Sequence, residues 1–418
     1  MFSTLSNAWK IPELRKKIMF TVVILLIYRL GNAIPVPFVV DELTETMAAV
    51  INNSILGLYD MMSGSALSQA TVLALGIQPY INSSIIIQLL TVAIPALERM
   101  AKEEGEEGKK KINQITRIAT VVLAVILGYG YYTILRANGM IEDAGFWAGL
   151  VIVVTFVAGS CAVMWLGEQI TEHGIGNGIS MILFAGIVSR LPSMIRMLFT
   201  MAWWQIIIVV IGMAALVVFI IFVNDAERRI PIQYAKRVVG RKVYGGQSTN
   251  LPIKVAMSGV MPVIFAQSIC SLPATVCTFA GWTENWAYKN LFSSTSWIYA
   301  IFYGLMIFFF SWFYAQIQYD PVEISNNLKK NGGFIPGFRP GKPTGDFIKK
   351  VIGKIVIFGA VYLTVVALLP IVAGNVMPGV QSLAIGGTSV IIVVGVALET
   401  VKAVEAQMLM RHYKGFLD

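Results

Sequence analysis

The chain has 418 residues, of which 56% are hydrophobic and only 13% are charged, and its mean hydropathy is +0.71. Soluble domains usually carry about 25% charged residues, so this composition excludes an ordinary water-soluble protein and indicates that much of the apolar surface faces lipid. The formal net charge is +9 at pH 7, and the positions of the basic residues carry more information than their sum.

Ten apolar segments follow one another along the chain. Each is close to the roughly 20 residues that cross about 30 Å of hydrocarbon, so we predict ten membrane spans. The fifth segment is short and starts with several glycines, and the even number of spans places both termini on one side of the membrane. The predicted spans are residues 18–34, 77–97, 112–135, 146–166, 175–188, 203–223, 251–274, 296–316, 350–371 and 383–401.

The segment between the first two spans, residues 35–76, contains no Lys or Arg. It is too apolar for a free loop, and Ser63, Gly64 and Ser65 interrupt it too strongly for a full span. Irregular backbone at membrane depth is tolerated only inside protein or beside water, so we predict a short helix folded back among the spans. A loop lying on the lipid headgroups is the alternative.

Basic residues gather before the first span and after the second, sixth and eighth spans. The positive-inside rule places these segments and both termini in the cytoplasm. The loop after the fourth span breaks the pattern, because it carries Glu168, Glu172 and His173 but no basic residue. The clustered residues are Lys10, Arg15, Lys16 and Lys17; Arg99, Lys102, Lys109, Lys110, Lys111 and Arg117; Arg228, Arg229, Lys236, Arg237, Arg241 and Lys242; and Lys329, Lys330, Arg339, Lys342, Lys349 and Lys350.

Two of the basic loops, at about residues 224–251 and 319–349, are long. The first contains strand-forming residues, and the second holds Gly-Gly and Pro-Gly pairs within residues 332–341, which predicts a shaped hairpin rather than a tether. Two such loops on one face predict a docking platform for a large negative partner, such as RNA or an acidic protein. The alternative is that they only set orientation, but a few charges are enough for that.

No pattern in the sequence is typical of an enzyme. Residues 337–342 have the wrong spacing for a phosphate-binding loop, and Cys161, Cys270 and Cys277 show no disulfide or metal-binding spacing. Residues 355–398 contain no charge, which argues against an ion-coupled transporter, and Glu168 and Asp225 are expected to be interfacial charges. We therefore expect no catalytic residues, no metal and no cofactor.

Several strings of residues are long and specific. They are residues 74–81 (ALGIQPYI), 174–180 (GIGNGIS), 228–237 (RRIPIQYAKR), 247–254 (QSTNLPIK), 326–330 (NNLKK), 336–341 (PGFRPG) and 386–389 (GGTS). In their order and spacing along the chain, these strings resemble the SecY/Sec61α family of protein-conducting channels, in its bacterial type.

The resemblance implies an all-α polytopic membrane protein with ten transmembrane helices in two inverted, pseudo-symmetric halves around an hourglass pore. Residues 1–188 would form the half with spans one to five, and residues 189–418 the half with spans six to ten. Inverted repeats around a central site are a known membrane architecture. The chain would be the central pore-forming subunit of the Sec channel in the cytoplasmic membrane, translocating unfolded signal-bearing polypeptides and inserting membrane proteins laterally into the bilayer.

The resemblance also implies partners and a closed pore. The expected partners are the SecE and SecG membrane subunits, the SecA ATPase, the ribosome, signal peptides, unfolded preproteins and membrane lipids. A plug at about residues 57–69 would close the pore from outside; its expected members are Gly57, Leu58, Met61, Met62, Ser63, Gly64 and Leu67.

An apolar ring is expected at the constriction. Two of its pairs are spaced i, i+4, so each pair shares one helix face, and a dry apolar constriction resists ions and water. Ordinary packing of isoleucines in membrane helices is the alternative, and Leu183 departs from the isoleucine expected there. The ring residues are Ile81, Ile85, Ile179, Leu183, Ile264 and Ile392.

Two further sets of residues follow from the resemblance. Gln88, Thr91 and Gln267 are polar residues on the spans that would form a lateral gate, where polar side chains can bond across helices at about 0.6–2 kcal/mol each. Residues expected to dock the motor or the ribosome are Arg228, Arg229, Lys236, Arg237, Arg241, Lys242, Lys329, Lys330 and Arg339.

Two other functions compete with a channel. A secondary transporter of small solutes would need a buried polar or charged substrate site, which we do not find in the sequence. An interaction scaffold without a pore would use the basic loops alone.

Overall fold

The computed structural model describes residues 8–39, 56–102, 104–141, 145–200, 202–234, 237–239, 242–244, 248–256, 259–279, 296–376 and 387–414. The helices in these ranges are α2 (Pro12–Gly31), α4 (Leu56–Ser63), α5 (Gln78–Ala93), α6 (Pro95–Lys102), α7 (Gly105–Ala137), α8 (Phe146–His173), α9 (Gly178–Ser189), α10 (Leu191–Leu198), α11 (Trp203–Asp225), α12 (Met261–Phe279), α13 (Trp297–Gln318), α14 (Pro321–Lys330), α15 (Lys342–Val376) and α17 (Gly387–Lys414).

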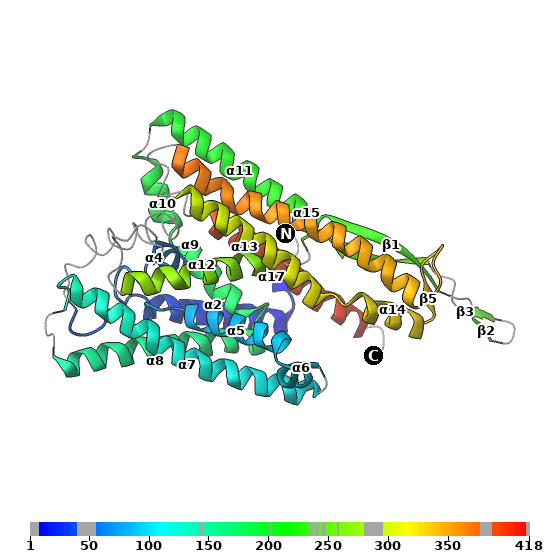
Figure 1. Ribbon diagram of the computed structural model, residues 1–418, viewed down its shortest axis with the longest axis horizontal. Coiled ribbons are helices and arrows are strands. Elements are labelled where there is room, and N and C mark those ends of the chain that lie inside the picture. The colour runs from blue at the N-terminus through cyan, green and yellow to red at the C-terminus, as the bar shows by residue number, and fades with distance from the viewer. Residues whose placement is uncertain are drawn as a thin grey trace.

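The helices pack in two neighbouring groups (Figure 1). In the first, α7 lies against α5 and α8, and α8 also contacts α2 and α9. In the second, α13 lies between α12 and α15, and α17 contacts α11 and α15. Helix α17 also packs on α9 and α12 on α7, so the two groups meet along these helices.

The lengths and hydropathy of the helices agree with a polytopic membrane protein. Among the described residues, six helical segments are long and apolar enough to cross a membrane, and the pair α5 and α6 would make a seventh. That pair bends by 106° after Ala93, where Pro95 disfavours continued helix at the preceding residue. Helix α7 begins at Gly105, before the predicted start of its span, and carries its basic first turns beyond the apolar stretch.

The predicted start of the seventh span is wrong. Residues Ser248–Lys254 form strand β4, and the helix of this span, α12, begins only at Met261. Leu251 and Ile253 alternate with Pro252 and Lys254, which is the two-residue period of a strand. Ile253 is buried in a small hydrophobic cluster separate from the main core, so its hydrophobicity contributes to this cluster.

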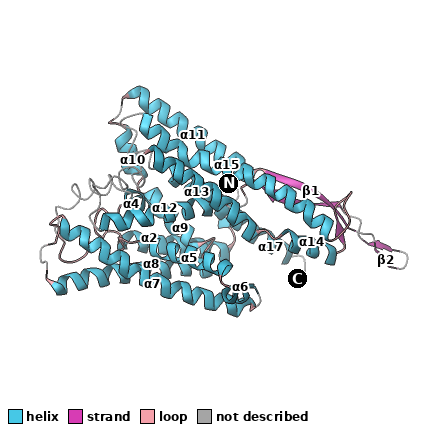
Figure 2. Cartoon of the chain, in the orientation of Figure 1, coloured by secondary structure: helices cyan, strands magenta, loops and turns pink. Residues whose placement is uncertain are grey.

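The strands lie together at one end of the molecule (Figure 2). Strand β1 (Glu227–Tyr234) pairs with β4 in antiparallel register, with Ile230 opposite Leu251, and its other edge pairs with β5 (Gly333–Phe334). The order of this sheet is β4-β1-β5, and β2 (Arg237–Val239) and β3 (Lys242–Tyr244) form a separate antiparallel pair.

The second basic loop is not the hairpin that its turn pairs predict. Asp320 caps helix α14 by accepting hydrogen bonds from the backbone of Val322 (2.8 Å) and Glu323 (3.4 Å), and Pro321 occupies the first turn. The short strand β5 follows and joins the sheet of the first loop, and helix α15 begins at Lys342. The two basic loops therefore form one structure.

This sheet is attached to the membrane helices by its own hydrophobic cluster. Ile230, Ile253 and Ile335 are buried against Ile348 and Ile352, which lie in the first turns of α15. Side chains alternate along β1, so burial of Ile230 leaves Arg229 exposed to solvent. The packing fixes the basic strand relative to the membrane helices.

Close helix packing depends on particular glycines. A Cβ at Gly159 of α8 would overlap the carbonyl oxygen of Val72, whereas Gly212 of α11 has no neighbour within 4 Å. Backbone cannot move aside as a flexible side chain can, so the space at Gly159 is available only to glycine.

We predict that Gly159→Ala lowers the free energy of unfolding by about 1–3 kcal/mol, because the added methyl group forces α8 away from residue 72. Gly212→Ala is the matched control and should be neutral or stabilising by about 0.5–1 kcal/mol, the usual gain in an open helix interior. Thermal unfolding in detergent compares the two variants. Equal stability of both would contradict this account of the packing.

Candidate functional site

Helix α4 lies inside the molecule rather than on its surface. Met61, Met62 and, just beyond the helix, Leu67 are each at most 5% exposed. The helix ends at Ser63 because Gly64 and Ser65 adopt positive φ values of 75° and 70°. For residues 56–76 the structure favours the helix folded back among the spans over a headgroup loop. The expected plug, residues 57–69, is helical only to Ser63 and continues as turns; the side chain of Leu58 lies outside the described residues.

Two helices bind α4 through side chains from opposite groups. The amide of Gln78, in α5, donates to the Met62 sulfur at 3.1 Å, and the amide of Gln267, in α12, lies 3.5 Å from the same atom. The hydroxyls of Tyr59 and Ser271 are hydrogen-bonded, which joins α4 to α12 a second time. Helix α4 therefore bridges the first and second helix groups.

The six expected ring residues share one large hydrophobic cluster, to which α2, α8, α11, α13 and α15 also contribute. Five are buried members of a single hydrophobic cluster that also contains Met62, and Ile179 is partly buried against it. They reach it from four helices, which are α5, α9, α12 and α17. Asn177 sets the position of α9 by accepting hydrogen bonds from the backbone of Ile179 (3.0 Å) and Ser180 (3.4 Å). The cluster is apolar where α4 inserts.

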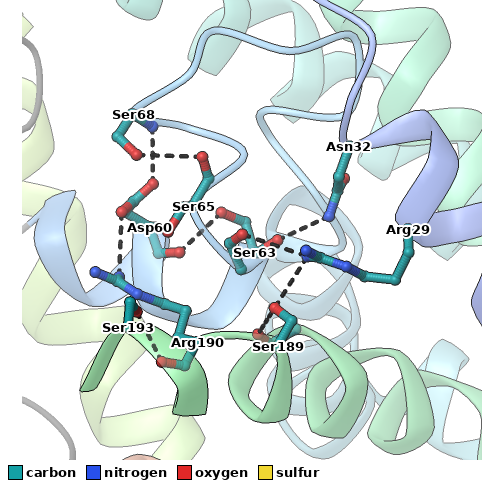
Figure 3. Close-up of polar contacts among 11 residues, drawn as sticks. Arg29, Asn32, Asp60, Ser63, Ser65, Ser68, Ser189, Arg190 and Ser193 are labelled. Carbon is teal, nitrogen blue, oxygen red and sulfur yellow. Dashed lines mark hydrogen bonds and ion pairs between the residues drawn. The ribbon is translucent and has the colours of Figure 1, made fainter. Parts of the chain in front are cut away.

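An ion pair fixes the middle of α4 (Figure 3). Arg190 Nη1 lies 3.1 Å from Asp60 Oδ2, and the backbone N–H of Ser68 donates to Asp60 Oδ1 at 2.7 Å. The Asp60 side chain is only 2% exposed. Burial raises the pKa of this carboxyl, and the Arg190 guanidinium opposes the shift without cancelling it.

A second set of donors holds the end of α4 (Figure 3). The carbonyl of Ser63 accepts from Asn32 Nδ2 at 3.0 Å and from the Tyr28 hydroxyl at 3.2 Å. Arg29 donates to the carbonyl of Gly64 at 3.4 Å and to Ser189 Oγ at 2.9 Å. These donors come from α2 and satisfy carbonyls that the helix end leaves without partners.

Close contact between α4 and α9 requires a glycine. A Cβ at Gly186 would overlap the carbonyl oxygen of Met62, so only glycine lets the two backbones approach this closely. The contact brings Ser189 and Arg190, at the end of α9, beside the polar end of α4.

The three expected gate residues do not form one cluster. Gln267 is buried and bound to Met62, whereas Thr91 donates to the carbonyl of Gln88 on its own helix at 2.7 Å. Gln88 and Thr91 are partly buried. The structure therefore links Gln267 directly to α4, whereas Gln88 interacts across the two helix groups with the Tyr314 side chain of α13.

Five of the expected docking residues have described side chains, and all five are exposed. Arg229 is paired with Glu227 at 2.6 Å. The turn that carries Arg339 is ordered by the Thr344 hydroxyl, which donates to the Arg339 carbonyl at 2.8 Å, and by the Phe338 and Phe347 rings, 4.2 Å apart. The exposed residues are Arg228, Arg229, Lys329, Lys330 and Arg339.

The remaining docking residues are placed only in part. Lys236 and Arg241 lie outside the described residues, and the side chains of Arg237 and Lys242, in β2 and β3, are also outside them. Within the described residues no group of three His, Cys, Asp or Glu side chains is placed to hold a metal ion. Glu168 pairs instead with Arg117 at 2.8 Å, and Asp225 with Lys402 at 2.7 Å.

Sequence reasoning missed the polar contacts of α4. One signal was present: Asp60 is the only charged residue in the apolar stretch from 56 to 76. A charge buried among apolar residues needs a partner, but the sequence alone does not say that the partner is Arg190, 130 positions later.

The fold and the site define an all-α polytopic membrane protein in which a short helix fills an apolar cluster at the meeting point of several spans. The family model described as SecY matches residues 71–401, and the chain belongs to the SecY family. The protein translocase subunit SecY of Streptomyces scabiei is 43% identical over 443 residues, covering 100% of both chains.

Two solved structures share the fold. One is a SecY protein whose plug domain stabilises the closed state of the translocation channel, with a TM-score of 0.66; the other is Sec61 in the canine ribosome–channel complex, with a TM-score of 0.60. Each is 16% identical, and the similarity covers 94% of this chain and 92% of the other. A secondary transporter is not supported by these comparisons.

We predict that Asn32→Ala lowers the free energy of unfolding by about 0.5–1.5 kcal/mol, because the buried carbonyl of Ser63 loses one of its two donors and keeps the Tyr28 hydroxyl. Asn138→Ala is the control, since its amide also donates to a backbone carbonyl, at 2.9 Å, but at an exposed helix end. It should cost less than about 1 kcal/mol. Thermal unfolding in detergent measures both, and a larger loss for Asn138→Ala would contradict the role given to Asn32.

Proposed function

We propose that this chain is the central pore-forming subunit of a channel that translocates unfolded, signal-bearing polypeptides across the cytoplasmic membrane and inserts membrane proteins laterally into it. One observation carries the proposal: side chains from α5, α9, α12 and α17 meet in a single buried apolar cluster that α4 fills. The family and the plugged channel structure with the same fold support it.

The ring is the proposed constriction. Its aliphatic side chains present no hydrogen-bonding group, so a passing polypeptide meets a soft apolar gasket, while water and ions lack a hydrated path. Met62 occupies the same cluster, so α4 completes the seal in the closed channel. Methionine is flexible and adapts to an irregular apolar gap.

The lateral gate is proposed to open where α4 bridges the helix groups. Separation of α12 from α5 would break the contact between Gln267 and Met62 and the hydrogen bond between Tyr59 and Ser271. These two interactions are weak compared with the packing of a whole helix interface, which suits a gate that a signal peptide must open. Gln88 and Thr91 would contribute from α5.

The sheet formed by the two basic loops is the proposed docking face. Its exposed arginines and lysines suit the SecA ATPase or a ribosome, and a ribosome-bound channel with this fold supports the second partner. By the positive-inside rule, the clustered basic residues support a cytoplasmic position for this face and for both termini. SecE and SecG would complete the channel in the membrane, where lipids surround it.

Deletion of residues 57–69 should make the closed channel conduct ions, because the apolar cluster loses the segment that fills it. The measurement is ion conductance of the assembled channel in planar bilayers without a substrate. Replacement of the same residues by a Gly/Ser chain of equal length is the control for loop strain and should also conduct. A scaffold or a carrier would not leak, so a tight deletion variant would contradict the channel.

Arg339→Glu should abolish motor-driven transport without loss of thermal stability, since the side chain is exposed and only its backbone orders the turn. Arg339→Lys should retain part of the activity, because lysine keeps the charge but not the planar bidentate pairing of arginine. Translocation into proteoliposomes measures both variants. Wild-type transport by Arg339→Glu would overturn the role of this residue.

A further inference from the structure

The ion pair of Asp60 joins α4 to a particular part of the chain. Arg190 is the C-cap residue of α9 and the N-cap residue of α10. It therefore lies in the segment between the first five predicted spans and α11. Its neighbour Ser189 accepts a hydrogen bond from Arg29, which in turn reaches the carbonyl of Gly64. The segment that connects the two halves therefore contacts the proposed plug directly at Arg190, and Ser189 is linked to it through Arg29.

This connecting segment has little packing of its own. No residue of α10 is buried. The Arg190 side chain is 21% exposed, whereas its partner Asp60 is 2% exposed. A shift of the segment would thus carry the guanidinium toward water with little resistance from a core, while the carboxylate would remain enclosed.

An enclosed carboxylate has two favourable environments. It is tolerated beside its arginine, and it is hydrated in water, but a buried charge that loses its partner is strongly destabilising. Hydrogen bonding from Ser68 satisfies one oxygen of Asp60 and does not neutralise the charge. Once Arg190 withdraws, an ionised Asp60 regains solvation when α4 leaves its position, and uptake of a proton is the competing route.

We propose that the Asp60–Arg190 ion pair is a latch that couples the position of the plug to the segment joining the two halves. When the halves move apart and displace residues 189–198, the latch opens and the unpaired charge of Asp60 favours release of α4 from the apolar cluster. The inference rests on the proposed function of α4 as the plug. It adds Arg190 as the residue that positions the plug and responds to the separation of the two halves.

The latch is tested by ion efflux from liposomes that contain the assembled full-length channel without a substrate. Arg190→Ala should raise the leak on the order of 10- to 100-fold, because the buried charge loses its partner. The double variant Asp60→Asn/Arg190→Ala should return to within several-fold of the parent, because it leaves no unpaired charge. Arg196→Ala is the matched control, an exposed arginine of the same helix, and should not leak.

Each alternative result overturns the latch. A tight Arg190→Ala channel would show that the ion pair does not hold the plug, and equal leaks from the single and double variants would show that the arginine acts through packing rather than charge. Deletion of residues 57–69 is run alongside. If that deletion does not leak, the plug itself is wrong; if it leaks while Arg190→Ala is tight, only the latch fails.

The coupling to the connecting segment needs a separate test. Cysteines are placed at positions 60 and 190 in a channel whose own Cys161, Cys270 and Cys277 are replaced by serine, and a reducible bifunctional thiol reagent joins them. Joining should stop transport of a signal-bearing substrate, and reduction should restore it. Undiminished transport by the joined channel would overturn the proposal that the plug separates from residue 190 during opening.

Discussion

The close packing of α4 against α9 is the contact on which the rest of the site depends. Gly186 lets the two backbones approach, and this approach places Met62 in the apolar cluster and Asp60 beside Arg190. A larger residue at position 186 would separate all of these contacts together. Sealing by apolar side chains and anchoring by polar ones are therefore two results of a single close packing.

The polar contacts of α4 are unequal on its two sides. Toward α2 and the end of α9 it has an ion pair and several hydrogen bonds to its carbonyls, whereas toward α12 it has a methionine contact and the Tyr59 hydroxyl, which interacts with Ser271 and Thr275. In an environment without water, each polar group must find its partner inside the protein. This asymmetry suits a helix that stays with the first group of helices until those partners are withdrawn.

Much of the architecture could be predicted from the sequence, because lipid imposes a simple rule. Long apolar segments must be helical in a bilayer, so most spans, the buried helix after residue 55 and the exposed basic loops followed from composition and charge. The rule failed at Leu251 and Ile253, where a short apolar stretch belongs to a strand and packs in the hydrophobic cluster beneath the sheet. It also failed for residues 319–349, where Asp320 and Pro321 start a helix before the turns.

The sequence by itself determined the membrane character and the family strings, since these depend on residue type and local spacing, and the resemblance carried by those strings implied the ring candidates. Only the tertiary structure decided that the two basic loops share one sheet, that Gln267 contacts Met62 while Thr91 does not, and that Asp60 is paired with Arg190. Those contacts join residues far apart in the chain, and their partners are selected by which backbones can approach closely. Local periodicity contains no information about that approach.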